Sequence, residues 1–268
     1  MKESAPIEHE LPGYNWTLKK LRRWIKLIFN CEVGRRTLSE LLHTHDLSWK
    51  KCQKLLKRAN PAKRAAFISA FQAVYTQICQ GELRSIYIDE AHFHRDMDLG
   101  YTWAEKGKPA WRLSDCPRLQ DRIDWYGAYD FTNGQCFLWN EGGCNGENTI
   151  KFLEQLAAWL GPSRGPTLLI WDGAPCHKAK CVQAAAAVLG FTILPLPGYS
   201  PDLNPIEGLW KWMREDVTQN HCYATMRELF DACKAFIARI NADPLAVINR
   251  LWPKFELDPE FEKLLVSK

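Results

Sequence analysis

The stretch from Gly198 to Glu215 constrains the fold more than any other part of the sequence, because it joins a stiff loop to the start of a helix. Pro201 and Pro205 hold the residues before them out of the helical conformation. Asn204 then predicts an N-cap, and Pro205 the first helical position. Apolar residues follow at helical spacing and predict a core-facing stripe: Ile206, Leu209, Trp210 and Met213. Glu207 falls in the first turn, where a carboxylate adds nothing to packing, so we treat it as a candidate functional residue.

The overall composition is that of an ordinary globular protein of 268 residues. No apolar run reaches the length of about 18 residues that a membrane span needs, and the N-terminus lacks the apolar centre of a signal peptide. The ten cysteines contain no C-x-x-C pair, which favours free thiols in a reducing compartment. We therefore expect a cytoplasmic protein with no membrane partner.

Charge is distributed unevenly along the chain. Residues 1–80 contain 15 Lys and Arg but only six Asp and Glu, whereas the whole chain has a net charge of +4. A basic N-terminal region ahead of a mildly acidic remainder indicates a polyanionic partner. A solvated helix surface is the alternative that this pattern leaves open.

Two amphipathic helices are predicted in the basic region, over residues 17–29 and 36–44, with Thr17 capping the first and Gly34 separating the two. Such a pair is typical of a helix-turn-helix, whose second helix enters the major groove of DNA. A plain helical hairpin is the alternative. The candidate DNA contacts are polar residues at and after the second helix: Arg35, Arg36, Thr37, Ser39, His43, Lys50 and Lys51. We expect a helix-turn-helix domain over residues 1–58, with a mobile lead-in.

The rest of the chain predicts a helical linker over residues 59–81 and one α/β domain over residues 82–268. Asn60 and Pro61 start the linker helix, and after Gly81 the apolar period changes to that of strands. Strands are expected at 86–88, 101–103, 125–129, 135–139, 167–171 and 191–194, and helices at 147–160, 179–189 and 226–240. Hairpins followed by alternating helices and strands favour a mixed central sheet flanked by helices.

Three acidic residues share a position at the end of a strand or the start of a helix. Asp89 follows the strand at 86–88, Asp172 follows the strand at 167–171, and Glu207 opens the helix described above. Ligands of open α/β sheets gather at such places. Converging carboxylates need a cation, and all-oxygen ligands suit Mg²⁺ or Mn²⁺. Two such ions support in-line displacement at a phosphodiester.

The sequences around these acids resemble the three catalytic blocks of mariner-superfamily transposases, most closely the bacterial insertion-sequence branch. The blocks are IYIDE, LLIWDGAPCH and GYSPDLNPIEGLW, and 34 residues separate Asp172 from Glu207. The resemblance implies a ribonuclease-H-like catalytic domain in which Asp89, Asp172 and Glu207 bind metal, with two Mg²⁺ ions that Mn²⁺ can replace. It also implies an enzyme that nicks transposon ends hydrolytically and joins the freed 3′-hydroxyl to target DNA.

The same resemblance implies partners and a setting. These are double-stranded DNA with inverted repeats, a TA target, a homodimer that pairs two ends, and the nucleoid of a bacterial cytoplasm. Relatives usually carry two helix-turn-helix units, and we expect an upstream one to be supplied elsewhere or lost. Two other functions stay open: a DNA-binding regulator without cleavage activity, and a structure-specific nuclease without strand transfer.

Neighbouring residues extend the candidate site. Glu90 points to the other face of an extended strand from Asp89, and His177 is matched in the family block, so we expect both to support the site from behind. Asp202 is expected to cap a turn. Further phosphate contacts are predicted on a long excursion at 104–124 and after Glu207: Lys106, Lys108, Arg112, Lys211 and Arg214.

Overall fold

A computed structural model describes residues 4–49, 60–115, 121–162 and 165–253. The chain folds as two compact units, residues 1–55 and 56–268. Within the described residues, none of the helices combines the length and the apolar character that a membrane span requires.

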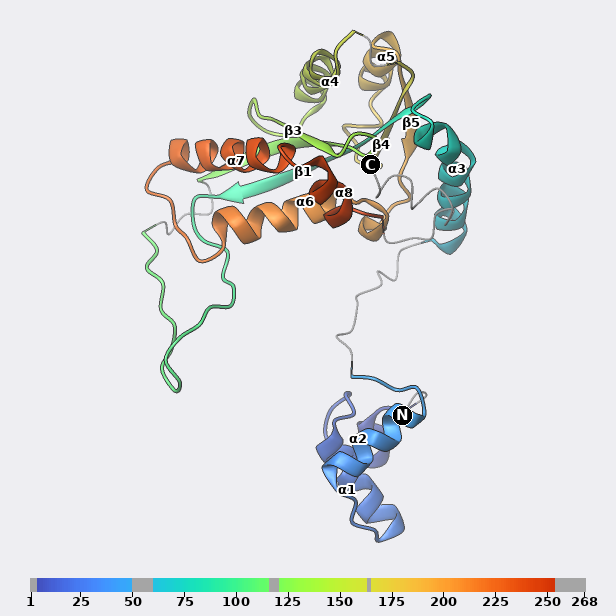
Figure 1. The fold of residues 1–268 in the computed structure, drawn as a ribbon, viewed down its shortest axis with the longest axis vertical. Coiled ribbons are helices and arrows are strands. Elements are labelled where there is room, and N and C mark those ends of the chain that lie inside the picture. The colour runs from blue at the N-terminus through green and yellow to red at the C-terminus, as the bar shows by residue number, and fades with distance from the viewer. Residues whose placement is uncertain (1–3, 50–59, 116–120, 163–164, 254–268) are drawn as a thin grey trace. The chain divides into compact units, whose positions relative to one another are not determined.

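The N-terminal unit contains the two predicted helices, α1 (Leu18–Phe29) and α2 (Arg35–Thr44), after a short 3₁₀ turn η1 (Pro6–His9) (Figure 1). Thr17 caps α1 as expected, since its hydroxyl accepts a hydrogen bond from the Lys20 N–H at 3.3 Å. Asn30 adopts a left-handed conformation and ends the helix. Leu21 and Leu38 are buried between the helices. The predicted helix-turn-helix arrangement of α1 and α2 is therefore present.

The second unit is built on a five-stranded mixed sheet in the order β3-β2-β1-β4-β5. The strands are β1 (Arg84–His94), β2 (Arg122–Asp130), β3 (Gln135–Trp139), β4 (Thr167–Trp171) and β5 (Phe191–Pro195). β1 to β3 form an antiparallel meander, while β4 and β5 add parallel strands on the other side of β1. The expected hairpin and both later strands are confirmed.

Helices cover the two faces of this sheet and create two apolar cores (Figure 1). One core lies under α4 (Gly146–Leu160) and α5 (Lys180–Val188) and includes Phe152 and Val182. The other lies under α3 (Pro61–Cys79), α6 (Ile206–Met213), α7 (Met226–Asn241) and α8 (Pro244–Arg250). Two single turns flank α6, a 3₁₀ turn η2 (Pro201–Leu203) and a π turn η3 (Arg214–Thr218). The predicted α/β class is confirmed.

Three expectations about elements need correction. The helix expected as a linker over 59–81 is α3, whose Phe71 and Ile78 are fully buried in the second unit. β1 runs to His94 rather than ending at Ile88, because its far half pairs with β2 alone. No strand forms at 101–103, where Tyr101 and Trp103 are fully exposed without a neighbouring strand.

The excursion between β1 and β2 begins at residue 95, earlier than expected, and its described part reaches residue 115. Its base is fixed against the end of η3 and the segment that follows it. The Arg95 guanidinium donates to the Tyr223 carbonyl at 2.8 Å, and the Asp98 N–H donates to the Thr218 carbonyl at 3.0 Å. The excursion is therefore a loop with an anchored base and exposed aromatic side chains.

Candidate active site

Asp89 lies in the middle of β1, not just beyond the strand as the sequence had indicated. Its register partner on β2 is Gly127. The Asp89 carboxylate accepts a hydrogen bond from the indole Nε1 of Trp210 at 3.0 Å. Burial, together with the negative charge of Glu207, raises the pKa of Asp89 to about 7 despite this hydrogen bond. Asp89 is thus a carboxylate whose charge is poorly compensated by the protein alone.

Asp172 comes directly after β4, as predicted, and is half exposed. Its Oδ1 accepts hydrogen bonds from the Ala174 N–H at 2.9 Å and from His177 Nδ1 at 2.8 Å. The bond from His177 lowers the pKa of Asp172 against the opposing effect of burial. Asp172 is therefore ionised and held in one orientation.

His177 links Asp172 to Glu90. Its Nε2 lies 2.8 Å from Glu90 Oε1, and its ring stacks on Trp171 with a centroid distance of 4.6 Å and an interplanar angle of 4°. Burial disfavours the charged ring, but the hydrogen bonds to the two carboxylates outweigh it and raise the pKa of His177 to about 10. The imidazolium form donates from both nitrogens and ties β1 to the loop after β4.

Glu207 lies in the first turn of α6, as predicted. Burial raises its pKa, Arg214 opposes the rise, and the negative charge of Asp172 adds to it. The helix begins one residue later than expected, with Pro205 rather than Asn204 at the N-cap position. Asn204 instead ends η2, and its side-chain oxygen is buried without a hydrogen-bond partner.

The loop that leads to Glu207 is fastened to α3. Arg64 makes a bidentate ion pair with Asp202, at 2.9 Å and 2.6 Å. The expectation that Asp202 caps a turn is thus incomplete, since its carboxylate joins two elements that are 138 residues apart. Tyr199 in the same loop has a left-handed backbone (φ 59°), which is uncommon for a bulky residue.

The three acids line one cavity of about 880 Å³, together with Lys63, Lys178 and Tyr199. A second cavity of about 570 Å³ shares Asp89 and Glu207 and is also lined by Glu90, His92, Lys211 and Arg214. Asp89 and Glu207 therefore have open space on more than one side. The arrangement can admit an extended anionic substrate beside the carboxylates.

The donor set fits a hard divalent cation. Asp89, Asp172 and Glu207 supply carboxylate oxygens, and two of them have raised pKa values that an adjacent cation would reverse. Among the described residues, however, no group of three or more His, Cys, Asp or Glu side chains is already arranged around a common metal position. The three carboxylates line the same cavity but do not converge on one metal position.

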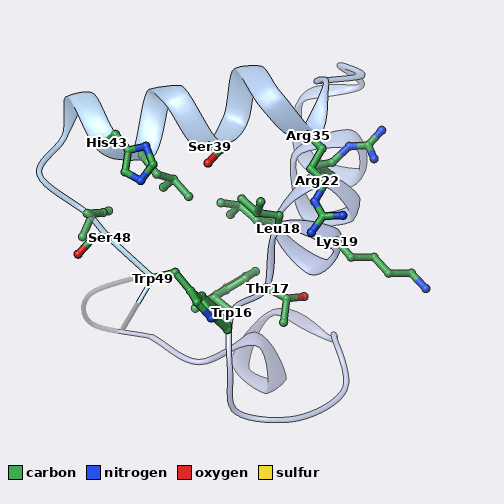
Figure 2. A pocket seen from close by; sticks show the side chains of 13 residues that line it. Trp16, Thr17, Leu18, Lys19, Arg22, Arg35, Ser39, His43, Ser48 and Trp49 are labelled. Atoms are coloured by element: carbon green, nitrogen blue, oxygen red, sulfur yellow. The ribbon is translucent and has the colours of Figure 1, made fainter. Parts of the chain in front are cut away.

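The predicted DNA contacts of the N-terminal unit lie on α2. Arg35, Arg36, Thr37 and His43 are exposed and Ser39 is half-buried, while Arg36 pairs with Glu40 at 2.8 Å. Figure 2 shows Arg35, Ser39 and His43 beside a pocket of about 770 Å³ with Trp16 and Trp49 on its other side. Lys50 and Lys51 lie outside the described residues.

The remaining predicted phosphate contacts have different environments. Lys106, Lys108 and Arg112 lie on the exposed excursion, where Lys108 pairs with Glu105 at 2.7 Å. Lys211 lies 3.7 Å from Glu215. Arg214 donates to the His92 carbonyl at 2.7 Å and to Asp98 at 3.3 Å, so its guanidinium already has protein partners.

Local sequence patterns do not predict the partners of Asp89 and Asp202, which are Trp210 and Arg64. Trp210 is expected only as a core residue, although an indole one helical turn after a candidate acid carries a donor that needs a partner. Arg64 is counted only in the basic region, and no local signal points to Asp202.

Known proteins resemble both units of the chain. A family model described as DDE superfamily endonuclease matches residues 84–230, and one described as winged helix-turn-helix matches residues 12–71. The insertion element IS630 uncharacterized 39 kDa protein of Shigella sonnei is 22% identical over 230 residues. These residues make up 85% of this chain and 66% of that protein, so the chain spans slightly less than two thirds of the relative's length.

Solved structures share the fold. The Mos1 strand transfer complex matches with a TM-score of 0.62 and 17% identity, covering 96% of this chain and 79% of that one. The Mos1 mariner paired end complex with Mn matches with a TM-score of 0.63 and 17% identity, covering 94% and 74%. The catalytic domain of Mos1 mariner transposase matches with a TM-score of 0.54 and 17% identity, covering 81% and 97%. The predicted fold, a ribonuclease-H-like domain after a helix-turn-helix domain, is confirmed.

Proposed function

The chain belongs to the DDE superfamily endonucleases, since that family's model covers more than half of it, and we propose on this premise that it is a DNA transposase. In the proposed reaction, water attacks a phosphodiester at a transposon end, the bond to the 3′ oxygen breaks, and a 3′-hydroxyl is released. That hydroxyl then attacks a target phosphodiester, forms a new bond, and releases a target 3′-hydroxyl. The first step breaks one phosphoester bond and leaves a 5′-phosphate beside the 3′-hydroxyl, whereas the second exchanges one phosphoester bond for another. In each step one proton moves from the nucleophile to the leaving oxygen.

The observation that carries the proposal is the cavity lined by Asp89, Asp172 and Glu207. The three side chains come from β1, from the end of β4 and from the start of α6, and they are the acids that the resemblance to mariner-superfamily transposases implies as catalytic. Two of them interact electrostatically across the cavity, since Glu207 raises the pKa of Asp89. Lys63 and Lys178 at the same cavity provide positive charge for a phosphate backbone.

We propose that these three carboxylates hold divalent ions, two Mg²⁺ with Mn²⁺ as a substitute. Bound ions would supply Lewis-acid stabilisation of the charge that develops at the phosphate. Structures of Mos1 with Mg and with Mn support this choice of metal. The chain's own contribution is to fix the ligands: His177 and Glu90 orient Asp172 from behind, as the 2.8 Å contacts on either side of the ring indicate.

The N-terminal unit would recognise double-stranded DNA at the inverted repeats. The winged helix-turn-helix match and the exposed basic residues of α2 support this role. The Mos1 paired-end complexes support assembly as a homodimer that holds two ends. A TA target and an association with the bacterial nucleoid complete the proposal, and both rest on the resemblance to mariner-superfamily transposases.

The test uses the full chain and a duplex that carries the inverted repeat flanking its gene. Nicked products and products joined to a target plasmid are measured over a Mg²⁺ and Mn²⁺ series, with DNA binding followed by electrophoretic mobility. We expect metal-dependent nicking and joining. If the protein nicks DNA but forms no joined product, even when a pre-cleaved end is supplied, a structure-specific nuclease is favoured. Binding without any cleavage would favour a DNA-binding regulator.

A further inference from the structure

Trp210 connects two of the three candidate metal ligands. It lies three residues after Glu207, which is one turn further along α6, and its side chain is almost fully buried. Its Nε1 donates to Asp89 Oδ2 at 3.0 Å across 121 residues of sequence. The same short helix therefore carries one acidic ligand and the donor that orients another.

The indole of Trp210 packs closely against the sheet at Gly127, which has no side chain to obstruct it. Gly127 is the register partner of Asp89 on β2. A Cβ atom at position 127 would lie 2.3 Å from Cη2 and 2.6 Å from Cζ2 of Trp210, closer than any real contact allows. The ring occupies the space that a side chain would fill. Only glycine at position 127 lets the indole reach Asp89 in this way.

Other neighbours hold the ring from the sides. Phe93, on the same face of β1 as Asp89, packs against it with a ring-centroid distance of 6.3 Å. The Cδ1 atom of Ile206, at the start of α6, lies 3.3 Å from the position that a Cβ atom would take on Gly127. Ile206 therefore bounds the space that the ring occupies. A buried ring held by several neighbours has little freedom to change its direction. The N–H of Trp210 therefore points at Asp89 as a fixed donor.

We propose that Trp210, packed over Gly127, is a positioning residue that orients the Asp89 carboxylate relative to Glu207 for metal binding. The inference rests on the proposed function, because it assumes that Asp89 is a metal ligand. Hydrogen-bond partners behind a ligand fix its orientation, and their loss typically weakens metal affinity by about 10- to 100-fold. Trp210 does this for Asp89, as His177 does for Asp172.

The experiment measures Mn²⁺ binding to the full chain without DNA, by calorimetry and by electron paramagnetic resonance of free Mn²⁺. Trp210→Phe keeps an aromatic ring and removes the donor. Replacing the Trp210 side chain with that of 3-benzothienylalanine is sharper, because sulfur takes the place of the N–H and the shape is retained. Gly127→Ala displaces the ring instead. Trp212→Phe is the matched control, since Trp212 lies on the same helix but packs against Phe236.

We expect Mn²⁺ affinity to fall about 10-fold in the Trp210 variants and in Gly127→Ala, with no change in Trp212→Phe. The melting temperature of the benzothienyl variant should match that of the wild type, which separates positioning from folding. Wild-type Mn²⁺ affinity in that variant would overturn the inference. In that case Asp89→Asn shows whether the proposed metal site or only the role of Trp210 is wrong. If Asp89→Asn also binds Mn²⁺ like the wild type, the proposed metal site is wrong. If Asp89→Asn loses Mn²⁺ binding, only the role of Trp210 is wrong.

Discussion

Asp172 and His177 show how single side chains prepare this site. His177 is 2% exposed and lies between two carboxylates, each 2.8 Å from one of its ring nitrogens. A neutral imidazole has one donor, so it can satisfy only one of these two acceptors. The charged ring satisfies both and keeps Asp172 ionised, whereas burial and the negative charge of Glu207 raise the pKa of Asp89.

This arrangement makes the stability of the metal-free protein depend on pH. The pKa of His177 is about 10 in the folded protein, against 6.5 for an unperturbed histidine. The folded state therefore holds a proton that the unfolded state releases, and the stabilisation is complete below about pH 6.5 and lost as the pH rises towards 10. Asp172, Glu90 and Cys176 are the titratable neighbours that face the ring.

We expect the free energy of unfolding of the wild type to fall by about 1–3 kcal/mol between pH 6.5 and pH 9.5, relative to His177→Gln. The measurement is urea unfolding in EDTA, with both proteins in a Cys176→Ser background so that the thiol does not contribute. Parallel pH profiles for the two proteins would contradict the claim that protonated His177 stabilises the fold by binding both carboxylates.

Only part of the site can be predicted at this scale. Asp172 and Glu207 stand at visible boundaries, between an apolar run and a glycine or after a proline, so their positions follow from sequence. The partners of Asp89 and Asp202 do not, because each lies more than 100 residues away. Local patterns carry no information about such contacts.

At the scale of elements, the loop before α6 is positioned by its attachment to α3. Arg64 is about 20% exposed and forms two hydrogen bonds to Asp202, which is about half exposed. A bidentate geometry adds direction to the attraction. Because Glu207 follows this loop directly, the ion pair couples the position of α3 to that of a proposed catalytic carboxylate.

A double-mutant cycle tests this link. With Arg64→Met, Asp202→Asn and the combined variant, we expect a coupling energy of about 0.5–1 kcal/mol in urea unfolding, since the pair is bidentate but partly solvated. Arg36 and Glu40, an exposed pair on α2, serve as the comparison and should couple by about 0.3–0.5 kcal/mol at most. Additive effects at Arg64 and Asp202 would show that the pair does not fasten the loop.

Elements with a clear period are predicted well, whereas their tertiary roles are not. The hairpin of β2 and β3 follows from its turn residues, and β4 follows from a short apolar run. The extent of β1 does not, because apolar and polar residues are mixed in its outer half, which pairs with β2 alone. The Asn60-Pro61 start and the apolar residues of α3 predict a helix but not the core against which it packs.

At the scale of the whole molecule, the chemistry and the basic helix pair belong to separate compact units. The N-terminal unit presents Arg35 and His43 from α2, beside a pocket with an apolar lining (Figure 2). The second unit carries all three acids. Binding and cleavage should therefore be separable by mutation.

We expect Arg35→Ala to weaken binding to inverted-repeat DNA and to reduce the slope of log K against log salt by about 1, as for one lost phosphate contact. Arg36→Ala should have a smaller effect, because Glu40 already compensates part of its charge. Arg227→Ala, which removes a paired arginine on α7, is the control and should leave the slope unchanged. Equal slopes for Arg35→Ala and the wild type would remove α2 from the DNA interface.

The central claim is that side chains from β1, β4 and α6 form one metal-dependent site. The most direct measurement is the rate of Mg²⁺-dependent nicking of inverted-repeat DNA by Asp89→Asn, Asp172→Asn and Glu207→Gln, with DNA affinity and melting temperature recorded for each. Each amide keeps the shape of its acid and removes one anionic ligand. We predict that all three variants fold and bind DNA like the wild type and lose nicking by at least about 100-fold. Wild-type nicking by any one of them would contradict the account.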